Sequence, residues 1–170
     1  MKNILVYVEA AEGKAKNVGL EILTPAKVAA DGGEVIAVVI GKDVEDAAKQ
    51  AIAFGADKAV VVAGDDYEVY NTDVYTNALV EVVKKYAPKA VFVGATPDGK
   101  DLAAKAAAKV GSGCVTNVTG VALDGDKIVY TSPVEGNYGV PILNATGFLV
   151  GINEEEFIEE LMQEVENLEL

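Results

Sequence analysis

The chain has 170 residues, of which 51% are hydrophobic, and this suits one domain with a substantial buried core. Its net charge of −13 makes nucleic acid and an anionic membrane surface poor partners. No apolar run is long enough to span a bilayer, the N-terminus lacks the layout of a signal peptide, and the single cysteine fits a reducing compartment. We therefore expect a cytoplasmic protein.

The sequence contains no histidine, no arginine and no tryptophan. Histidine is the usual general acid–base near neutral pH and a common metal ligand, and arginine is the usual clamp for phosphate. A Ser–His or Cys–His catalytic pair is therefore impossible. We expect no enzymatic activity, no catalytic residue and no metal site.

Apolar strands and helices alternate from the N-terminus to residue 110. The pattern predicts strands over residues 4–8, 34–41, 59–62 and 91–93, and helices over residues 17–30, 44–54, 72–86 and 99–110. Pro25 either kinks the first helix or restarts it with Thr24 as N-cap. Thr72 or Asp73 is expected to cap the third helix.

Continuous apolar strands separated by helices predict the α/β class: a three-layer α/β/α, doubly wound, mostly parallel sheet. After residue 113 the pattern changes, and residues 121–131 predict a β-hairpin around Asp124-Gly125-Asp126-Lys127. A late strand over 142–150 and an acidic helix over 152–170 follow. We expect one domain over residues 1–170.

The stretch over residues 94–107 carries the strongest indication of a binding site. It follows an apolar strand and opens a helix, which is where α/β proteins present backbone N–H groups to an anion. Gly94, Gly99 and Lys100 match a phosphate loop, but Asp101 replaces the Ser or Thr that would bind magnesium. An ordinary capped helix is the alternative. Its N-cap would be Thr96 with Pro97 after it, or else Asp98.

A second glycine turn, at residues 111–113, could also approach a phosphate. The candidate phosphate-facing residues are Gly94, Thr96, Gly99, Lys100, Ser112 and Gly113. Asp101 and Lys105 are expected to form an exposed ion pair within the helix. The turn after the first strand lacks the glycine spacing of a dinucleotide site.

Three other groups of residues favour structural roles. Cys114 is expected to be a small buried filler rather than a nucleophile. Asp65, Asp66 and Glu68 are more typical of a solvated loop than of a cation site. The tyrosines near residue 70 are expected to pack rather than to stack on a base; they are Tyr67, Tyr70 and Tyr75.

Several segments resemble, in order and spacing, the N-terminal domain of the electron transfer flavoprotein alpha subunit. They are residues 4–9, 19–24, 54–58, 72–86, 94–107, 111–120 and 132–137. This sequence departs from the family at Lys100, Lys105 and Ser132, where arginine is usual, and at Asn117, where aspartate is frequent. The glycine-rich and arginine-containing motifs of the family's FAD-binding C-terminal domain do not occur in these 170 residues.

The resemblance implies an adenine-nucleotide-binding-like fold that acts as a scaffold in electron transfer. It implies association with a beta-type subunit, a flavin domain, or a second copy as a homodimer. FAD or AMP would belong to the family complex, and this chain alone would bind no cofactor tightly and would not be redox active. The alternative is a stand-alone module that binds AMP, ATP or FAD and forms a homodimer, since the turns at 94–99 and 111–113 could approach a phosphate.

Overall fold

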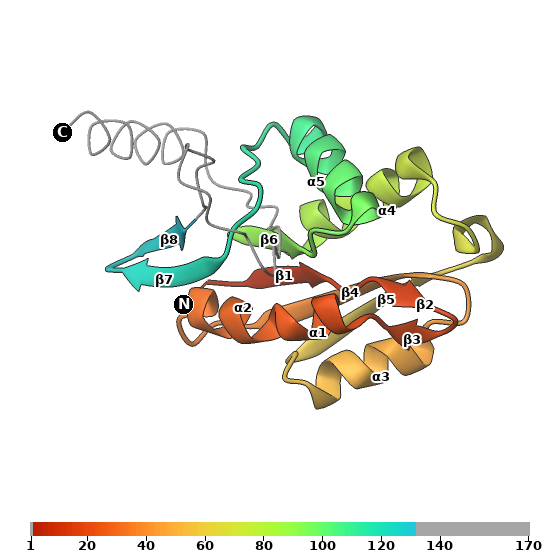
Figure 1. Cartoon of the computed structure of the whole chain (residues 1–170), viewed down its shortest axis with the longest axis horizontal. Helices are drawn as coiled ribbons and strands as arrows, with labels where there is room; N and C mark the ends of the chain where they lie inside the picture. The colour runs from red at the N-terminus through yellow and green to blue at the C-terminus, as the bar shows by residue number, and fades with distance from the viewer. Residues whose placement is uncertain (1, 132–170) are drawn as a thin grey trace, which may run out of the picture.

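A four-stranded parallel sheet forms the centre of the computed structural model, which describes residues 2–131 (Figure 1). Its strands, in spatial order, are β5 (Lys58–Ala63), β4 (Val35–Gly41), β1 (Ile4–Tyr7) and β6 (Ala90–Val93). Ile4 pairs with Val35 on one side and with Ala90 on the other. The strands β1, β4 and β6 are buried at every residue, as continuous apolar runs predict for a sheet covered on both faces.

Helices cover both faces of this sheet. On one face lie α1 (Asn17–Glu21), α2 (Leu23–Ala30) and α3 (Glu45–Ala53), and on the other lie α4 (Thr72–Tyr86) and α5 (Pro97–Val110). Alternate residues of β1 point to opposite faces, so that Ile4 and Val6 pack on the first layer and Leu5 and Tyr7 on the second. The predicted three-layer, doubly wound fold is confirmed.

Shorter elements surround this frame. A small hairpin, β2 (Ala10–Ala11) and β3 (Lys14–Ala15), follows β1, and a 3-10 turn, η1 (Asp65–Tyr67), follows β5. The predicted later hairpin is confirmed as β7 (Gly120–Asp124) and β8 (Lys127–Thr131), with Gly125 at a positive φ of 58° in its turn. Ile128 and Tyr130 of β8 join the core on the α2 face.

The predicted strand over 142–150 and the acidic helix over 152–170 lie outside the described residues, and the prediction of one domain over 1–170 remains a prediction. Among residues 2–131, no helix combines the length and the apolar character needed to cross a bilayer.

Two predicted N-caps are wrong. The helix expected over 17–30 restarts, as one of the two alternatives for Pro25 required, but the N-cap of the second helix, α2, is Ile22 in place of Thr24. Pro25 lies within the first turn of α2, where a missing N–H breaks no helical hydrogen bond. The cap of α4 is Asn71 rather than Thr72 or Asp73: its Oδ1 accepts from the Asp73 and Val74 N–H groups at 3.1 and 3.2 Å.

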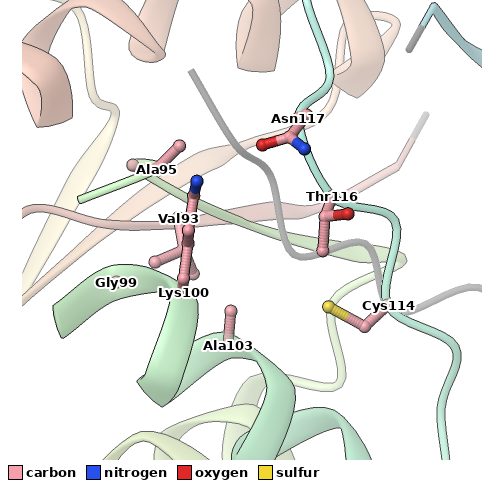
Figure 2. Close-up of a pocket in the computed structure, with 9 residues that line it drawn as sticks. Val93, Ala95, Gly99, Lys100, Ala103, Cys114, Thr116 and Asn117 are labelled. Atoms are coloured by element: carbon pink, nitrogen blue, oxygen red, sulfur yellow. The ribbon is translucent and has the colours of Figure 1, made fainter. Parts of the chain in front are cut away.

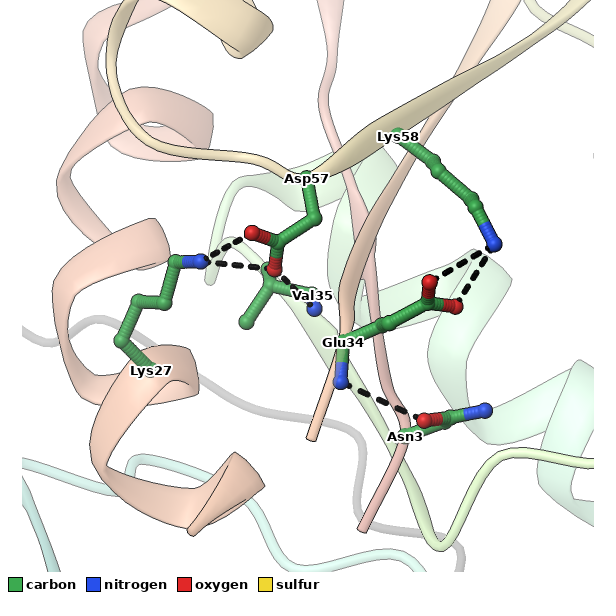
Figure 3. A network of polar contacts seen from close by, with 6 residues as sticks. All are labelled: Asn3, Lys27, Glu34, Val35, Asp57 and Lys58. Carbon is green, nitrogen blue, oxygen red and sulfur yellow. Dashed lines mark hydrogen bonds and ion pairs between the residues drawn. The ribbon is translucent and has the colours of Figure 1, made fainter. Parts of the chain in front are cut away.

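Polar contacts join α2, β4 and β5 near the amino ends of the strands (Figure 3). Asp57 accepts from Lys27 Nζ at 2.6 Å and from the Val35 N–H at 2.8 Å. Lys58 Nζ lies 2.8 Å from the Glu34 carboxylate. The Lys27 ammonium and the Val35 N–H lower the pKa of Asp57, because both favour its charged form.

Candidate functional site

The order of the strands reverses between β1 and β6, and the region beyond the carboxyl ends of these two strands is called the crevice below. The chain builds β1, β4 and β5 outward in one direction, and then returns through α4 to place β6 on the other side of β1. The loops that leave β1 and β6 therefore separate toward opposite faces of the sheet. In open α/β sheets, ligands bind at this point, beyond the carboxyl ends of the strands. The residues that fill the crevice decide what it can bind.

A buried carboxylate, Glu9, occupies the β1 side of the crevice and is 7% exposed. The Thr96 hydroxyl, from the loop after β6, donates a hydrogen bond to Glu9 Oε2 at 2.6 Å. The Lys16 ammonium forms an ion pair with Glu9 Oε1, and the Lys16 N–H donates to the Glu9 carbonyl oxygen at 2.8 Å. The carboxylate is therefore held on both of its oxygens by the protein itself.

The N-terminus of α5 also opens into this crevice. Thr96 is the N-cap of α5, because the Thr96 Oγ1 accepts a hydrogen bond from the Gly99 N–H at 2.9 Å. Pro97 follows at the first helical position. This confirms one of the two predicted alternatives for the cap. The same hydroxyl donates to Glu9. The partial positive charge of the helix end thus has a carboxylate of the same chain beside it.

Two candidate site glycines are required by close contacts within the chain. A Cβ on Gly99 would lie 2.0 Å from the Gly94 carbonyl oxygen. A Cβ on Gly94 would lie 2.7 Å from the Val18 side chain of α1. Both positions therefore need glycine for packing, whether or not a ligand approaches. Their role toward a phosphate stays a prediction.

A narrow cavity lies beside this turn (Figure 2). Gly94, Gly99 and Lys100 are among its lining residues, and Figure 2 shows Cys114, Thr116 and Asn117 across from Lys100. Its volume of about 10 Å³ has room for roughly one water molecule. Of the six predicted phosphate-facing residues, the structure brings Gly94, Gly99 and Lys100 to this cavity and Thr96 to Glu9, whereas Ser112 and Gly113 do not line the cavity.

Cys114 is half-buried in the wall of this cavity. Burial raises the pKa of its thiol, because a thiolate is poorly solvated there. A raised pKa reduces the fraction of reactive thiolate. This environment fits the predicted role of a small packing residue.

The tyrosines pack against one another on the α4 face. The Tyr75 ring meets Tyr67 and Tyr70 edge to face, with ring centroids 5.8 and 5.0 Å apart, so the predicted packing role is confirmed. The Tyr70 hydroxyl donates to Asp101 Oδ2 at 3.0 Å, and burial raises the pKa of Tyr70 to about 12, which keeps it a donor.

The predicted ion pair within α5 is wrong. Asp101 accepts from Tyr70 and Thr72, while Lys105 reaches across to Asp73 of α4. Contacts between helices replace the contact along one helix.

The acidic loop after β5 is engaged by a lysine. Lys42 Nζ lies 3.2 Å from both Asp65 and Glu68, and the hydrogen bonds to these carboxylates raise the pKa of Lys42. Within residues 2–131, no group of three His, Cys, Asp or Glu side chains is arranged to hold a metal ion.

Sequence reasoning missed Glu9 and Lys16 as residues of the crevice. Glu9 comes directly after a buried strand, and this position was the available signal. Its importance depends on which strand lies beside β1, and the order of strands is not visible in a local pattern.

Comparison with known proteins gives the chain its family. Residues 4–150 match the family model of the electron transfer flavoprotein domain. The chain belongs to the electron transfer flavoprotein family. It is 38% identical over 139 residues to the electron transfer flavoprotein subunit alpha of Megasphaera elsdenii, and 32% identical over 133 residues to that of Bacillus subtilis (strain 168).

These matches cover 79% and 78% of this chain but 41% of each relative, so the chain spans about two fifths of the length of these alpha subunits. The predicted resemblance to electron transfer flavoprotein alpha subunits is thereby confirmed. A solved structure of a universal stress protein in complex with cAMP aligns over 63% of this chain and 88% of that chain, with a TM-score of 0.40 and 19% identity.

Proposed function

We propose that this chain supports electron transfer as a scaffold, by association with a beta-type electron transfer flavoprotein subunit and with a flavin-carrying domain. In this role it holds no flavin tightly and accepts no electrons itself. The observation that carries the proposal is the Glu9–Thr96 hydrogen bond. It holds the Glu9 carboxylate at the position where this class of sheet would bind a nucleotide.

A phosphate in the crevice would meet an unfavourable charge. Glu9 already lies beside the N-terminus of α5, and a phosphate placed there would be repelled by its carboxylate. Moving Glu9 away would leave the Lys16 ammonium without its carboxylate partner and the Thr96 hydroxyl without its acceptor. Both costs favour a scaffold over a nucleotide-binding module.

The lysine at position 105 also favours a scaffold over a nucleotide-binding module. Lys105 stands where the family commonly has arginine, and its ammonium is engaged by Asp73 within the domain. Lysine keeps the charge but lacks the planar fork that binds phosphate through two parallel hydrogen bonds.

Co-expression with a beta-type electron transfer flavoprotein subunit tests the association. The chain should co-purify with that subunit, and visible flavin absorbance should require the complex or a flavin domain. The chain purified alone should be colourless. Stoichiometric flavin that stays with the isolated chain through dialysis would overturn the proposal.

Titration calorimetry with AMP, ATP and FAD tests the competing nucleotide-binding role. We expect no heat of binding with the unmodified chain. Glu9→Gln is the informative variant, because it removes the carboxylate charge with little change in shape. Binding of AMP by the unmodified chain would contradict the scaffold role, whereas binding by Glu9→Gln alone would support the view that Glu9 excludes anions.

A further inference from the structure

The strand at one edge of the sheet, β5, is apolar and open. Its sequence is Lys58-Ala59-Val60-Val61-Val62-Ala63, and none of these residues is fully buried. Val61 is 39% exposed. At the opposite edge, every residue of β6 is buried. The two edges of one sheet therefore differ sharply in what they present to solvent.

An open edge strand is normally protected by a bulge, a proline, an inward-pointing charge or very short length. β5 lacks all of these. Its register with β4 runs without interruption from Lys58 to Ala63, it contains no proline, and its one charge stands at its first residue. The helix α3 packs beside β5, and its residue Ile52 and its C-cap Phe54 are 44% and 64% exposed.

The backbone of β5 presents unused hydrogen-bonding groups along this edge. The Gly64 N–H donates to the Gly41 carbonyl oxygen of β4 at 3.4 Å, and the direction of backbone groups alternates along a strand. Val60 and Val62 therefore direct their N–H and C=O groups toward β4, and Ala59, Val61 and Ala63 direct theirs away. Within residues 2–131, no strand pairs with that outer side.

We propose that β5 pairs antiparallel with β5 of a second copy of this chain, about a two-fold axis at Val61, so that the two sheets join. In this register Val61 lies opposite Val61 of the second copy, and Ala59 lies opposite Ala63. The outward groups of these residues then complete a ladder. The arrangement is self-complementary, as a two-fold interface requires.

The charges at the two ends of β5 favour this direction of pairing. The strand begins with Lys58 and is followed by Asp65 and Asp66. An antiparallel two-fold pairing brings the end of β5 that carries Lys58 to the end of the other copy that the acidic turn η1 follows, whereas parallel pairing would place like charges together. The pairing would also cover an open groove beside the edge. Its walls combine apolar residues with one amide and two charged side chains: Val60 and Val62 of β5, Tyr67, and Asn77, Ala78, Glu81, Val82, Lys85 and Tyr86 of α4.

This pairing does not depend on the proposed function, and sedimentation equilibrium tests it directly. We expect the unmodified chain to sediment at twice its own mass. Val61→Glu should sediment as a monomer up to about 1 mM, since it places two like charges on the axis. Val129→Glu is the matched control, because Val129 is 40% exposed on a different strand, β8, and it should remain a dimer. A monomeric unmodified chain, or a dimer that Val129→Glu dissociates and Val61→Glu does not, would overturn the proposal.

Amide hydrogen exchange on the unmodified chain gives a test that needs no variant to fold. The amides of Val60 and Val62 should be protected at every concentration, because they bond to β4. The amides of Ala59, Val61 and Ala63 should be protected at high concentration and should exchange quickly on dilution. Rapid exchange of these three amides at all concentrations would contradict the pairing.

Discussion

Thr96 and Glu9, 87 residues apart in the sequence, are joined by a hydrogen bond of 2.6 Å between the loops that leave β6 and β1. The Thr96 hydroxyl also accepts from the Gly99 N–H, so one side chain both caps α5 and fixes the buried carboxylate. One hydroxyl therefore links the two loops that flank the switch point between β1 and β6.

Replacement of Thr96 by valine should destabilise the domain. Thr96→Val keeps the shape of the side chain but removes the cap of α5 and the donor to Glu9, and we expect a loss of about 2 kcal/mol in the free energy of unfolding. Thr96→Ser keeps the hydroxyl and should retain most of that free energy. Urea unfolding of the two variants measures the difference, and equal midpoints would show that the hydroxyl contributes nothing.

Replacement of Gly99 by alanine should destabilise the domain more than replacement of a glycine whose Cβ position is free of other atoms. Its Cβ would lie 2.0 Å from the Gly94 carbonyl oxygen, so the loop after β6 must shift, at a cost of about 3 kcal/mol. Gly111→Ala is the control: Gly111 has a φ of 69° with no atom near its Cβ position, and strain alone should cost about 1 kcal/mol. Thermal unfolding compares them, and a smaller loss for Gly99→Ala would contradict the geometry.

Asp57 should make the stability of the domain depend on acidity. The pKa of Asp57 is lowered in the folded state. Its contribution to the free energy of unfolding is therefore fully present above the ordinary aspartate pKa of about 3.9, and it is lost as the pH falls through the pKa of the folded state. Asp57→Asn should cost about 1 kcal/mol at neutral pH, and the difference should shrink below the folded pKa.

Asp46→Asn is the matched control for that experiment, because Asp46 pairs with Lys49 at 2.7 Å on an exposed helix surface. We expect its effect on the free energy of unfolding to be smaller than that of Asp57→Asn, because solvent screens an exposed pair. Urea unfolding across acidic pH, with NMR titration of both carboxylates, gives the measurement. An Asp57 pKa at or above its ordinary value would refute the assigned network.

Cys114 should react slowly with alkylating reagents. Burial raises the pKa of its thiol, so the thiolate fraction in mildly alkaline solution is smaller than for a free cysteine with a pKa of about 8.5. The rate of iodoacetamide modification, followed against pH, should reach half of its maximum above that value. Unfolding the chain in urea should bring back the ordinary profile, and a folded protein that reacts as fast as the unfolded one would contradict the described burial.

Sequence patterns could predict the layers of the fold because the strands of the central sheet are almost entirely apolar and the helices between them each have an apolar face. The cap of α4 was missed because Asn71, Thr72 and Asp73 are all good caps, and only the direction of the chain selects Asn71. Pro25 did indicate that the helix could restart, but Ile22 has no side chain that can cap a helix, so no local pattern identified it as the N-cap of α2.

The candidate site was harder to predict for a physical reason. The glycine turn and the Thr96 cap are local features, and the sequence carries both. The Glu9 contact depends on β6 lying beside β1, which follows from the order of the whole sheet. Lys105 likewise meets Asp73 only because α4 and α5 pack side by side.

The contrast between the two outer strands also limits how far an assembly can grow. A filament of joined sheets needs two open edges on every molecule, and among the strands of residues 2–131 only β5 combines an end position with exposed residues, since β6 at the other end is buried throughout. Once two copies pair through β5, the exposed edge strand of each copy is covered by the other. Association along this sheet must then stop at a closed pair rather than propagate into a fibre.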